Sequence, residues 1–253
     1  MSNRTVDLVD VDAMLGRHPA LDAGEGTVAE FVAELDRVGV SEAIVGHTLS
    51  WLHEPAAGNQ RAIEVTADQP RLRPVWVMLP ASTDELPPPA EFAAQARAQG
   101  VAAVRAYPGD HGYDLAGADA GPTLAALADA RLPLLVDFLQ TSWATVEAVA
   151  HRLPELSIVV CHCSYRTLRQ IAGVLSRTDN VHLCLSNLAS HCGLEWLVER
   201  FGAGRLLFGT GAPEEDPAEA VTRLLWSELD DDAVAAIGSG NARRLFSAEV
   251  AAR

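Results

Sequence analysis

Apolar residues along this chain form two alternating patterns: short continuous runs, and longer stretches with an apolar residue at every third or fourth position. Short apolar runs are typical of β-strands that are buried on both faces. Eight runs fit this pattern, and we expect strands at Val6–Val11, Ser41–His47, Arg71–Met78, Val101–Tyr107, Leu132–Phe138, Leu156–His162, Val181–Ser186 and Arg205–Thr210.

The longer stretches between these runs have helical spacing. In Thr27–Val38, for example, Val28, Phe31, Val32 and Leu35 fall on one face of a helix. The same spacing predicts further helices at Glu91–Gln99, Thr123–Ala130, Trp143–Arg152, Tyr165–Ser176 and Glu195–Phe201.

A strand followed by a helix, repeated along the chain, predicts the α/β class and a closed barrel of parallel strands, the (β/α)8 or TIM barrel. We expect a single domain over residues 1–253, because no linker divides the chain. The alternative is an open, doubly wound sheet. That fold would normally carry a G-x-G-x-x-G turn after its first strand, and the sequence has none there.

The composition excludes several classes of protein. All 19 basic residues are arginine. Schiff-base aldolases, pyridoxal-phosphate enzymes and P-loop nucleotide hydrolases need a lysine amine, so all three are excluded. The formal net charge is −15, and a surface this acidic repels nucleic acids and anionic membranes. We therefore expect a small-molecule substrate as the partner, with no nucleic acid and no membrane.

The beginning of the sequence bears on location. Residues 1–5 lead straight into the first apolar run, without the longer apolar stretch of a secretory signal. No apolar run approaches the roughly 20 residues that span a bilayer. We therefore expect a cytoplasmic protein, and a homodimer is the oligomer to test for.

The chain has four cysteines, Cys161, Cys163, Cys184 and Cys192, and a cytosolic setting disfavours disulfides between them. Cys161 and Cys163 flank His162, as in some metal clusters. Because side chains alternate along a strand, we expect both cysteines to point away from the side that His162 faces. The sequence therefore favours small core residues over a zinc site here.

Polar side chains with catalytic potential gather at the predicted strand ends, where the active site of such a barrel lies. The residues at these ends, or in the loops that follow them, are Asp10, Asp12, His47, Arg105, Tyr107, His111, Asp137 and His162. His18, His53 and His151 lack such a placement, and we expect them at the surface.

Two pairs among these residues have more than one interpretation. The Arg105 guanidinium suits bidentate binding of a substrate carboxylate, but a buried Arg105–Asp137 pair joining two neighbouring strands is the alternative. Asp10 and Asp12 lie on one side of the first strand. Paired carboxylates divide into an acid and a base when their surroundings differ.

Four segments resemble the amidohydrolase-related family, which includes aminocarboxymuconate semialdehyde decarboxylase, resorcylate decarboxylases and pyrone dicarboxylate lactonase. Phe201–Pro213 resembles the last strand and its Phe-Gly-Ser-Asp-x-Pro type of turn, and Ser239–Phe246 resembles the closing helix. Leu156–His162 resembles the sixth strand, and Asp10–Gly16 resembles the first, which normally reads Asp-x-His-x-His-x-Gly. The resemblance implies the barrel fold and a hydrolase or lyase activity.

The metal-binding positions depart from the family's pattern. The resemblance implies two histidines on the first strand, one each on the fifth and sixth, and an aspartate after the eighth. Asp12, Met14, Asp137, His162 and Gly211 stand at these positions. Gly211 removes the aspartate that takes a proton from the metal-bound water. We therefore expect no metal cofactor; the alternative is an ion such as zinc held by Asp12, Asp137 and His162.

Two functions agree with these observations. The first is an amidohydrolase-like hydrolase or lyase that acts on a small organic acid or amide without the usual metal-bound water. In it His162, Asp12 and Asp137 would be catalytic. The residues expected to bind the substrate are Asp10, His47, Arg105, Tyr107 and His111. The alternative is a non-catalytic barrel that binds a small molecule or a partner protein, since fold alone does not separate the two.

Overall fold

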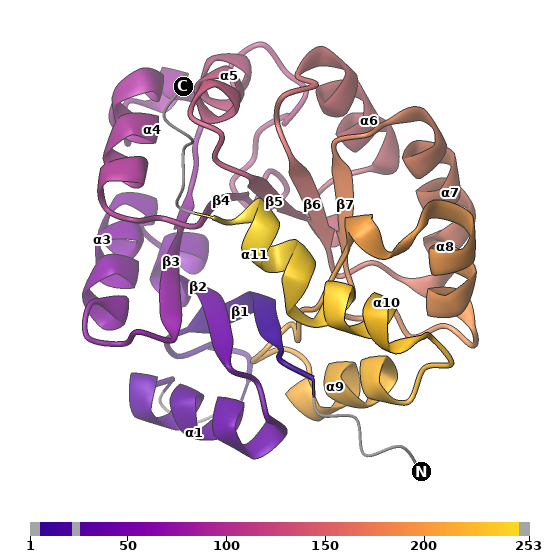
Figure 1. The fold of residues 1–253 in the computed structure, drawn as a ribbon. Coiled ribbons are helices and arrows are strands. Elements are labelled where there is room, and N and C mark those ends of the chain that lie inside the picture. Colours follow the sequence, from indigo (N-terminus) through magenta and orange to yellow (C-terminus); the bar gives the residue numbers. More distant parts are fainter. Residues whose placement is uncertain (1–5, 22–25, 248–253) are drawn as a thin grey trace.

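The strands form a closed barrel, which the computed structural model describes for residues 6–21 and 26–247 (Figure 1). Eight parallel strands follow one another in chain order. Hydrogen bonds from Val11 N to Phe208 O (3.1 Å) and from Met14 N to Ala212 O (2.9 Å) join the first strand to the segment of the last. The strands are β1 Val9–Leu15, β2 Glu42–His47, β3 Leu72–Val77, β4 Ala103–Ala106, β5 Leu134–Asp137, β6 Ile158–Cys161, β7 Val181–Cys184 and β8 Leu206–Leu207.

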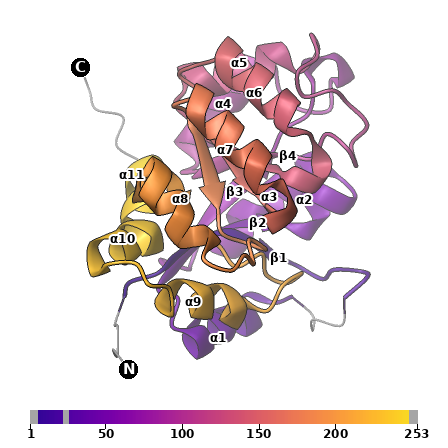
Figure 2. The same ribbon diagram turned by 90° about the vertical axis from the view of Figure 1, so that its right-hand side faces the viewer.

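Helices surround the barrel, as Figures 1 and 2 show from two sides. The helices of the first half are α1 Val28–Val38, α2 Thr48–Leu52, α3 Pro55–Thr66, α4 Pro89–Ala98 and α5 Gly121–Asp129. Those of the second half are α6 Trp143–Arg152, α7 Leu168–Arg177, α8 Gly193–Phe201, α9 Pro217–Leu225, α10 Asp231–Ala235 and α11 Asn241–Leu245. Apolar side chains between the strands and these helices form the larger of two core clusters.

The second core cluster fills the inside of the barrel. Val11, Ile44 and Leu135 are among its members, and α11 adds Ala242 while Phe246 follows directly. Figure 1 shows α11 lying across the barrel. Ala242 and Phe246 line one small hollow together with residues at the beginnings of β1, β2 and β3. Because this end is covered, a site has to open at the opposite end, where the strands finish.

The structure confirms the predicted TIM barrel, and each of the eight predicted runs overlaps one strand. The first strand lies later than predicted, at Val9–Leu15 instead of Val6–Val11. It continues through Asp10 and Asp12 because both carboxylates find partners inside the protein. The single domain was predicted over residues 1–253, of which 1–5, 22–25 and 248–253 lie outside the described residues.

No helix was predicted between the second and third strands, where α2 and α3 lie. The sequence of α3 is polar and contains Gly58, which hides its helical character. A Cβ atom at Gly58 would lie 2.1 Å from Ser50 N, so the glycine lets α3 pack closely on α2. Within residues 6–21 and 26–247, no helix is both long and apolar enough to cross a membrane.

Candidate active site

His162 lies at the carboxyl end of the barrel, directly after β6. Its backbone φ is 52°, a left-handed conformation that residues other than glycine rarely adopt. The backbone N–H donates to Ser186 Oγ at 3.0 Å, and the side chain is only 7% exposed. The regular alternation of the strand therefore stops at Cys161, and His162 is held in a separate, fixed orientation.

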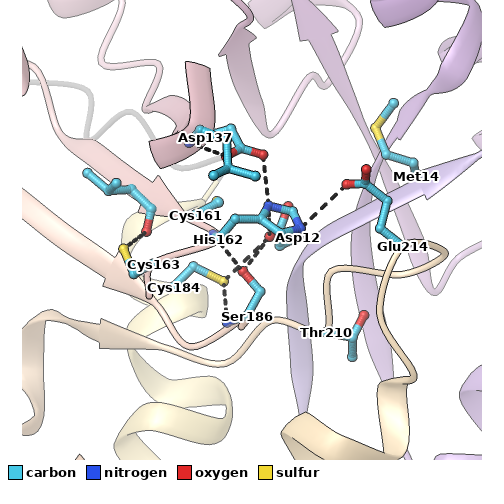
Figure 3. Close-up of polar contacts among 12 residues, drawn as sticks. Asp12, Met14, Asp137, Cys161, His162, Cys163, Cys184, Ser186, Thr210 and Glu214 are labelled. Atoms are coloured by element: carbon cyan, nitrogen blue, oxygen red, sulfur yellow. Dashed lines mark hydrogen bonds and ion pairs between the residues drawn. The ribbon is translucent and has the colours of Figure 1, made fainter. Parts of the chain in front are cut away.

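The imidazole ring of His162 lies between carboxylates (Figure 3). Its Nδ1 is 2.9 Å from Asp137 Oδ2 and 3.5 Å from Asp12 Oδ2. Its Nε2 is 3.5 Å from Glu214 Oε2. Among the described residues, neither ring nitrogen has a hydrogen-bond partner, and the three contacts are ion pairs when the ring is protonated. Burial lowers the pKa of His162, but the charges of Asp12 and Asp137 outweigh it and raise the pKa to about 10.

Asp12 connects His162 to the far side of the barrel. Arg105 Nη2 donates to Asp12 Oδ1, and Ser186 Oγ donates to Asp12 Oδ2 at 2.6 Å. Burial raises the pKa of Asp12, but the positive charges of Arg105 and His162 prevail and hold it at about 2. The carboxylate is therefore ionised at neutral pH and shared between two cations.

The partner of Arg105 differs from the one that the sequence suggested. A pair with Asp137 on the neighbouring strand was the alternative, but Arg105 bonds to Asp12 across the barrel. In the register of β4 and β5, Arg105 stands opposite Leu135. Asp137 therefore lies two residues nearer the carboxyl end of the barrel than the residue opposite Arg105. The Arg105 Nε is buried and has no hydrogen-bond partner among the described residues.

Asp10 belongs to a different network from Asp12. Thr210 N and Asp12 N donate to Asp10 Oδ1, both at 2.9 Å, and Thr210 Oγ1 donates to Oδ2 at 2.5 Å. These neighbours are uncharged, and burial raises the pKa of Asp10 to about 6. Asp10 therefore joins β1 to the segment after β8 and does not face His162.

Aromatic residues cover the site. Trp51 stacks on Tyr107 with ring centroids 5.0 Å apart, and Trp51 Nε1 donates to Asp110 Oδ2 at 2.6 Å. His111 Nε2 lies 2.7 Å from Trp51 O. Trp51 and Tyr107 belong to the wall of a chamber of about 10 Å³, which is lined by Asp12, Met14, Trp51, Arg105, Tyr107, Asp137, His162, Gly211, Ala212 and Glu214.

The structure brings five of the eight predicted site residues into this chamber: Asp12, Arg105, Tyr107, Asp137 and His162. Asp10, His47 and His111 are absent from its lining. His47 Nδ1 accepts from Leu49 N at 3.1 Å and caps α2, and His111 contacts the backbone of Trp51. These three hold the surroundings of the chamber, and substrate contact by them stays a prediction.

Two site residues were missed by reasoning from the sequence. Glu214 follows Gly211, whose φ is 75°, and Glu214 N donates to Gly211 O at 3.0 Å. This turn brings the Glu214 carboxylate to His162, and burial raises the pKa of Glu214. The available signal for Glu214 in the sequence was a carboxylate three residues after Gly211.

His18, expected at the surface, is half-buried and lines a second, larger cavity nearby.

Cys161 also departs from expectation. It was predicted to face away from His162, yet Arg105 Nη2 donates to Cys161 Sγ at 3.3 Å inside the barrel. Alternation does not separate the two residues, because His162 has left the strand conformation. Cys163 does point outward, into the cluster beneath the helices.

In the part of the chain that the structure describes, two groups of side chains have ligand-type atoms within 4.8 Å of one another: Asp12 with Cys161 and Cys184, and Asp137 with His162 and Glu214. An ion is therefore compatible with the spacing of these atoms. The residues do not fit the metal site that the family resemblance implies. Met14 and Gly211 supply no oxygen or nitrogen side-chain ligand, and Arg105 already neutralises Asp12. Asp137, His162 and Glu214 nevertheless offer ligand atoms that all lie within 4.8 Å of one another, so a metal ion is plausible here, although none was expected from the sequence.

Comparison with known proteins places the chain among barrels of this type. A family model described as Amidohydrolase matches residues 7–248. No match was found among curated proteins.

Several solved structures share the fold. A 5-carboxyvanillate decarboxylase from Sphingomonas paucimobilis has a TM-score of 0.77 at 15% identity, covering 96% of this chain and 99% of its own. A 5-carboxyvanillate decarboxylase from Novosphingobium aromaticivorans with bound manganese has a TM-score of 0.74 at 14% identity, covering 95% and 97%. A probable 2-pyrone-4,6-dicarboxylic acid hydrolase from Acinetobacter baumannii has a TM-score of 0.70 at 16% identity, covering 95% and 99%.

Proposed function

Since the chain belongs to the amidohydrolase family, we propose that it is an acid–base enzyme of this family, a hydrolase or lyase of a small organic acid or amide that works without a metal-bound water. The observation that carries the proposal is the buried His162 ring between Asp137 and Glu214. The similar structures include decarboxylases and a hydrolase of small organic acids, which supports the two reaction types.

In the proposed mechanism His162 is a general acid. The raised pKa keeps both ring nitrogens protonated at neutral pH. Asp137 lies at Nδ1 and fixes the ring, while the proton on Nε2 is the one to be transferred. A protonated histidine serves a hydrolase by protonating the leaving group while a water molecule attacks and gives its proton to Glu214. It serves a lyase by protonating the carbanion left after a C–C bond breaks.

Glu214 would return the proton to His162. Its carboxylate faces Nε2 at 3.5 Å, and its side chain is 37% exposed, so it touches both the ring and solvent. Burial raises its pKa, which brings it nearer to the pH at which a carboxyl exchanges protons readily. Arg105, with its unpaired Nε, would orient a substrate oxygen.

The proposal is tested by metal analysis together with turnover. The purified protein is assayed for bound metals, and then for release of product from 5-carboxyvanillate, 2-pyrone-4,6-dicarboxylate and benzamide, with and without chelator. We expect activity within twofold of its starting value after chelation. We expect His162→Asn to lower it about 100-fold or more, and the exposed-site control His151→Asn to leave it unchanged.

Stoichiometric manganese or zinc, with activity lost to the chelator and restored by the ion, would overturn the metal-free mechanism and assign Asp137, His162 and Glu214 to an ion.

The second candidate is a non-catalytic barrel that binds a small molecule. The observation that favours it is the small volume of the chamber, about 10 Å³, which holds about one water molecule. This function predicts no turnover of any compound in the panel, and saturable binding of a compound that His162→Asn leaves unchanged.

A further inference from the structure

A large cavity lies beside the chamber that contains His162. Its volume is about 680 Å³, within the range of pockets that bind small molecules. It is lined by Gly16 and His18 after β1, by side chains of α1 and by residues 212–217 after β8. Met14, Ala212 and Glu214 line both the cavity and the chamber, so the two spaces adjoin.

One part of the cavity wall is apolar. Phe31 on α1, Pro213 and Pro217 after β8, and Met14 and Leu15 on β1 all line the cavity, and Met14 also lines the chamber. An apolar wall of this kind favours a ligand with a hydrocarbon or aromatic body, because contact removes apolar surface from water on both sides.

The charges around the cavity have one prevailing sign. One guanidinium, that of Arg37, accompanies five carboxylates, those of Glu30, Glu34, Glu214, Glu215 and Asp216. Arg37 is already paired, with Nε 2.8 Å from Glu34 Oε2 and Nη2 3.1 Å from Asp216 Oδ1. The Glu30 carboxylate accepts from Thr27 at the beginning of α1.

Of the cavity carboxylates, Glu214 also lines the chamber, and Glu215 follows it in the chain. Both amides donate to Gly211 O, at 3.0 Å and 3.1 Å, so one turn presents the two side chains together. The buried His162 Nε2 has no hydrogen-bond partner among the described residues and lies 3.5 Å from Glu214 Oε2. A ligand in the cavity thus contacts two carboxylates, one of which also contacts the ring of His162.

We propose that this cavity binds the body of the substrate and selects a small molecule with an apolar body and a cationic group, such as an ammonium or amidinium. The inference rests on the proposed function only in placing the reacting group of the substrate at His162. Among the acids and amides proposed as substrates, the cavity selects amides that carry a positive charge. A free aromatic carboxylate would face like charges in the cavity.

The test compares three probes of one shape: benzylammonium, benzyl alcohol and benzoate. Binding is measured by calorimetry at low ionic strength, and its position by amide NMR shifts at Phe31 and Ala212. We expect benzylammonium to bind about tenfold more tightly than benzyl alcohol, with the preference reduced in 0.5 M salt, and benzoate not to saturate. Equal or tighter binding of benzoate would overturn the proposal.

Two matched variants locate the charge that matters. Glu215→Gln removes a cavity carboxylate, and we expect it to weaken benzylammonium binding about fivefold. Glu199→Gln makes the same change at an exposed position on α8, outside the cavity, and should leave binding unchanged. Equal effects of the two variants would refute a specific site. Preference for benzylammonium without turnover of any substrate would contradict the proposed function alone. Turnover without a preference for benzylammonium would contradict this inference alone.

Discussion

Asp10 and Asp12 lie two residues apart on one strand, and both are almost completely buried, yet their surroundings differ. Asp10 accepts hydrogen bonds from neutral groups, and its pKa rises to about 6. Asp12 lies against Arg105 and His162, and its pKa falls to about 2. Burial alone raises the pKa of any carboxylate. The difference therefore comes from the cations on β4 and after β6, which only the closed barrel brings to one of the two.

One network is charged and contains Asp12, Arg105, Ser186 and His162. The other is uncharged in its donors: Thr210 donates to Asp10, and this contact links the first strand to the segment after the last. This comparison explains why one strand supplies both a structural carboxylate and a site carboxylate. It also predicts that substitutions in the two networks have different effects.

The largest effect is expected from Arg105→Met. Removal of the guanidinium leaves the buried Asp12 carboxylate without its main partner, and such a loss costs about 3–5 kcal/mol of unfolding free energy. Urea denaturation measures it. Arg177→Met, which breaks the exposed pair with Glu147, is the matched control and should cost at most about 1 kcal/mol. Similar losses in both variants would contradict the distinction between the two environments.

A smaller effect is expected from Ser186→Ala. The hydroxyl donates to Asp12 and accepts from His162 N, so both partners lose a bond, at a cost of about 2 kcal/mol. In Ser176→Ala, an exposed hydroxyl on α7 is removed, and we expect a change within about 0.5 kcal/mol. Thermal unfolding of the two variants and the wild type measures these changes. If the stability of Ser186→Ala equals that of the wild type, Ser186 does not contribute to the network.

The smallest effect is a change in pH dependence on Asp10→Asn. The pKa of Asp10 is about 6 when folded and near 3.9 when unfolded. The folded state therefore takes up the proton first, and the contribution of Asp10 to stability rises as the pH falls from 7 to 4. In Asp10→Asn the side chain cannot be protonated in this range, so we expect the increase in unfolding free energy between pH 7 and pH 4 to be smaller by about 1–2 kcal/mol. Urea denaturation at pH 7 and pH 4 tests it, and parallel profiles for the two proteins would contradict it.

Much of this could be predicted from the sequence, because the spacing of apolar residues depends only on local geometry. The barrel follows from that spacing. The meeting of Asp12, Asp137 and His162 follows from the rule that parallel strands end at one face. The identity of the partners did not follow. Arg105 bonds across the barrel to β1, a contact set by side-chain reach and not by the order of strands.

Glu214 was missed for a similar reason. Its approach to His162 depends on the turn after β8, where Gly211 has a positive φ, and nothing in the spacing of residues fixes the path of such a turn. The left-handed backbone of His162 likewise ends the alternation on which the prediction for Cys161 relied. In both places, tertiary contacts decide the conformation.

The central claim is that His162 is a cation held by carboxylates, and ¹⁵N NMR of its ring tests this most directly. The spectra are recorded on the protein as purified, from pH 6 to pH 11. We predict that both ring nitrogens are protonated at pH 7.5 and that the ring loses its proton near pH 10. The stabilisation from its ion pairs should be complete below about pH 6.5 and disappear as the pH rises through 10. A neutral ring at pH 7.5, or a nitrogen signal shifted by a bound metal, would contradict the account.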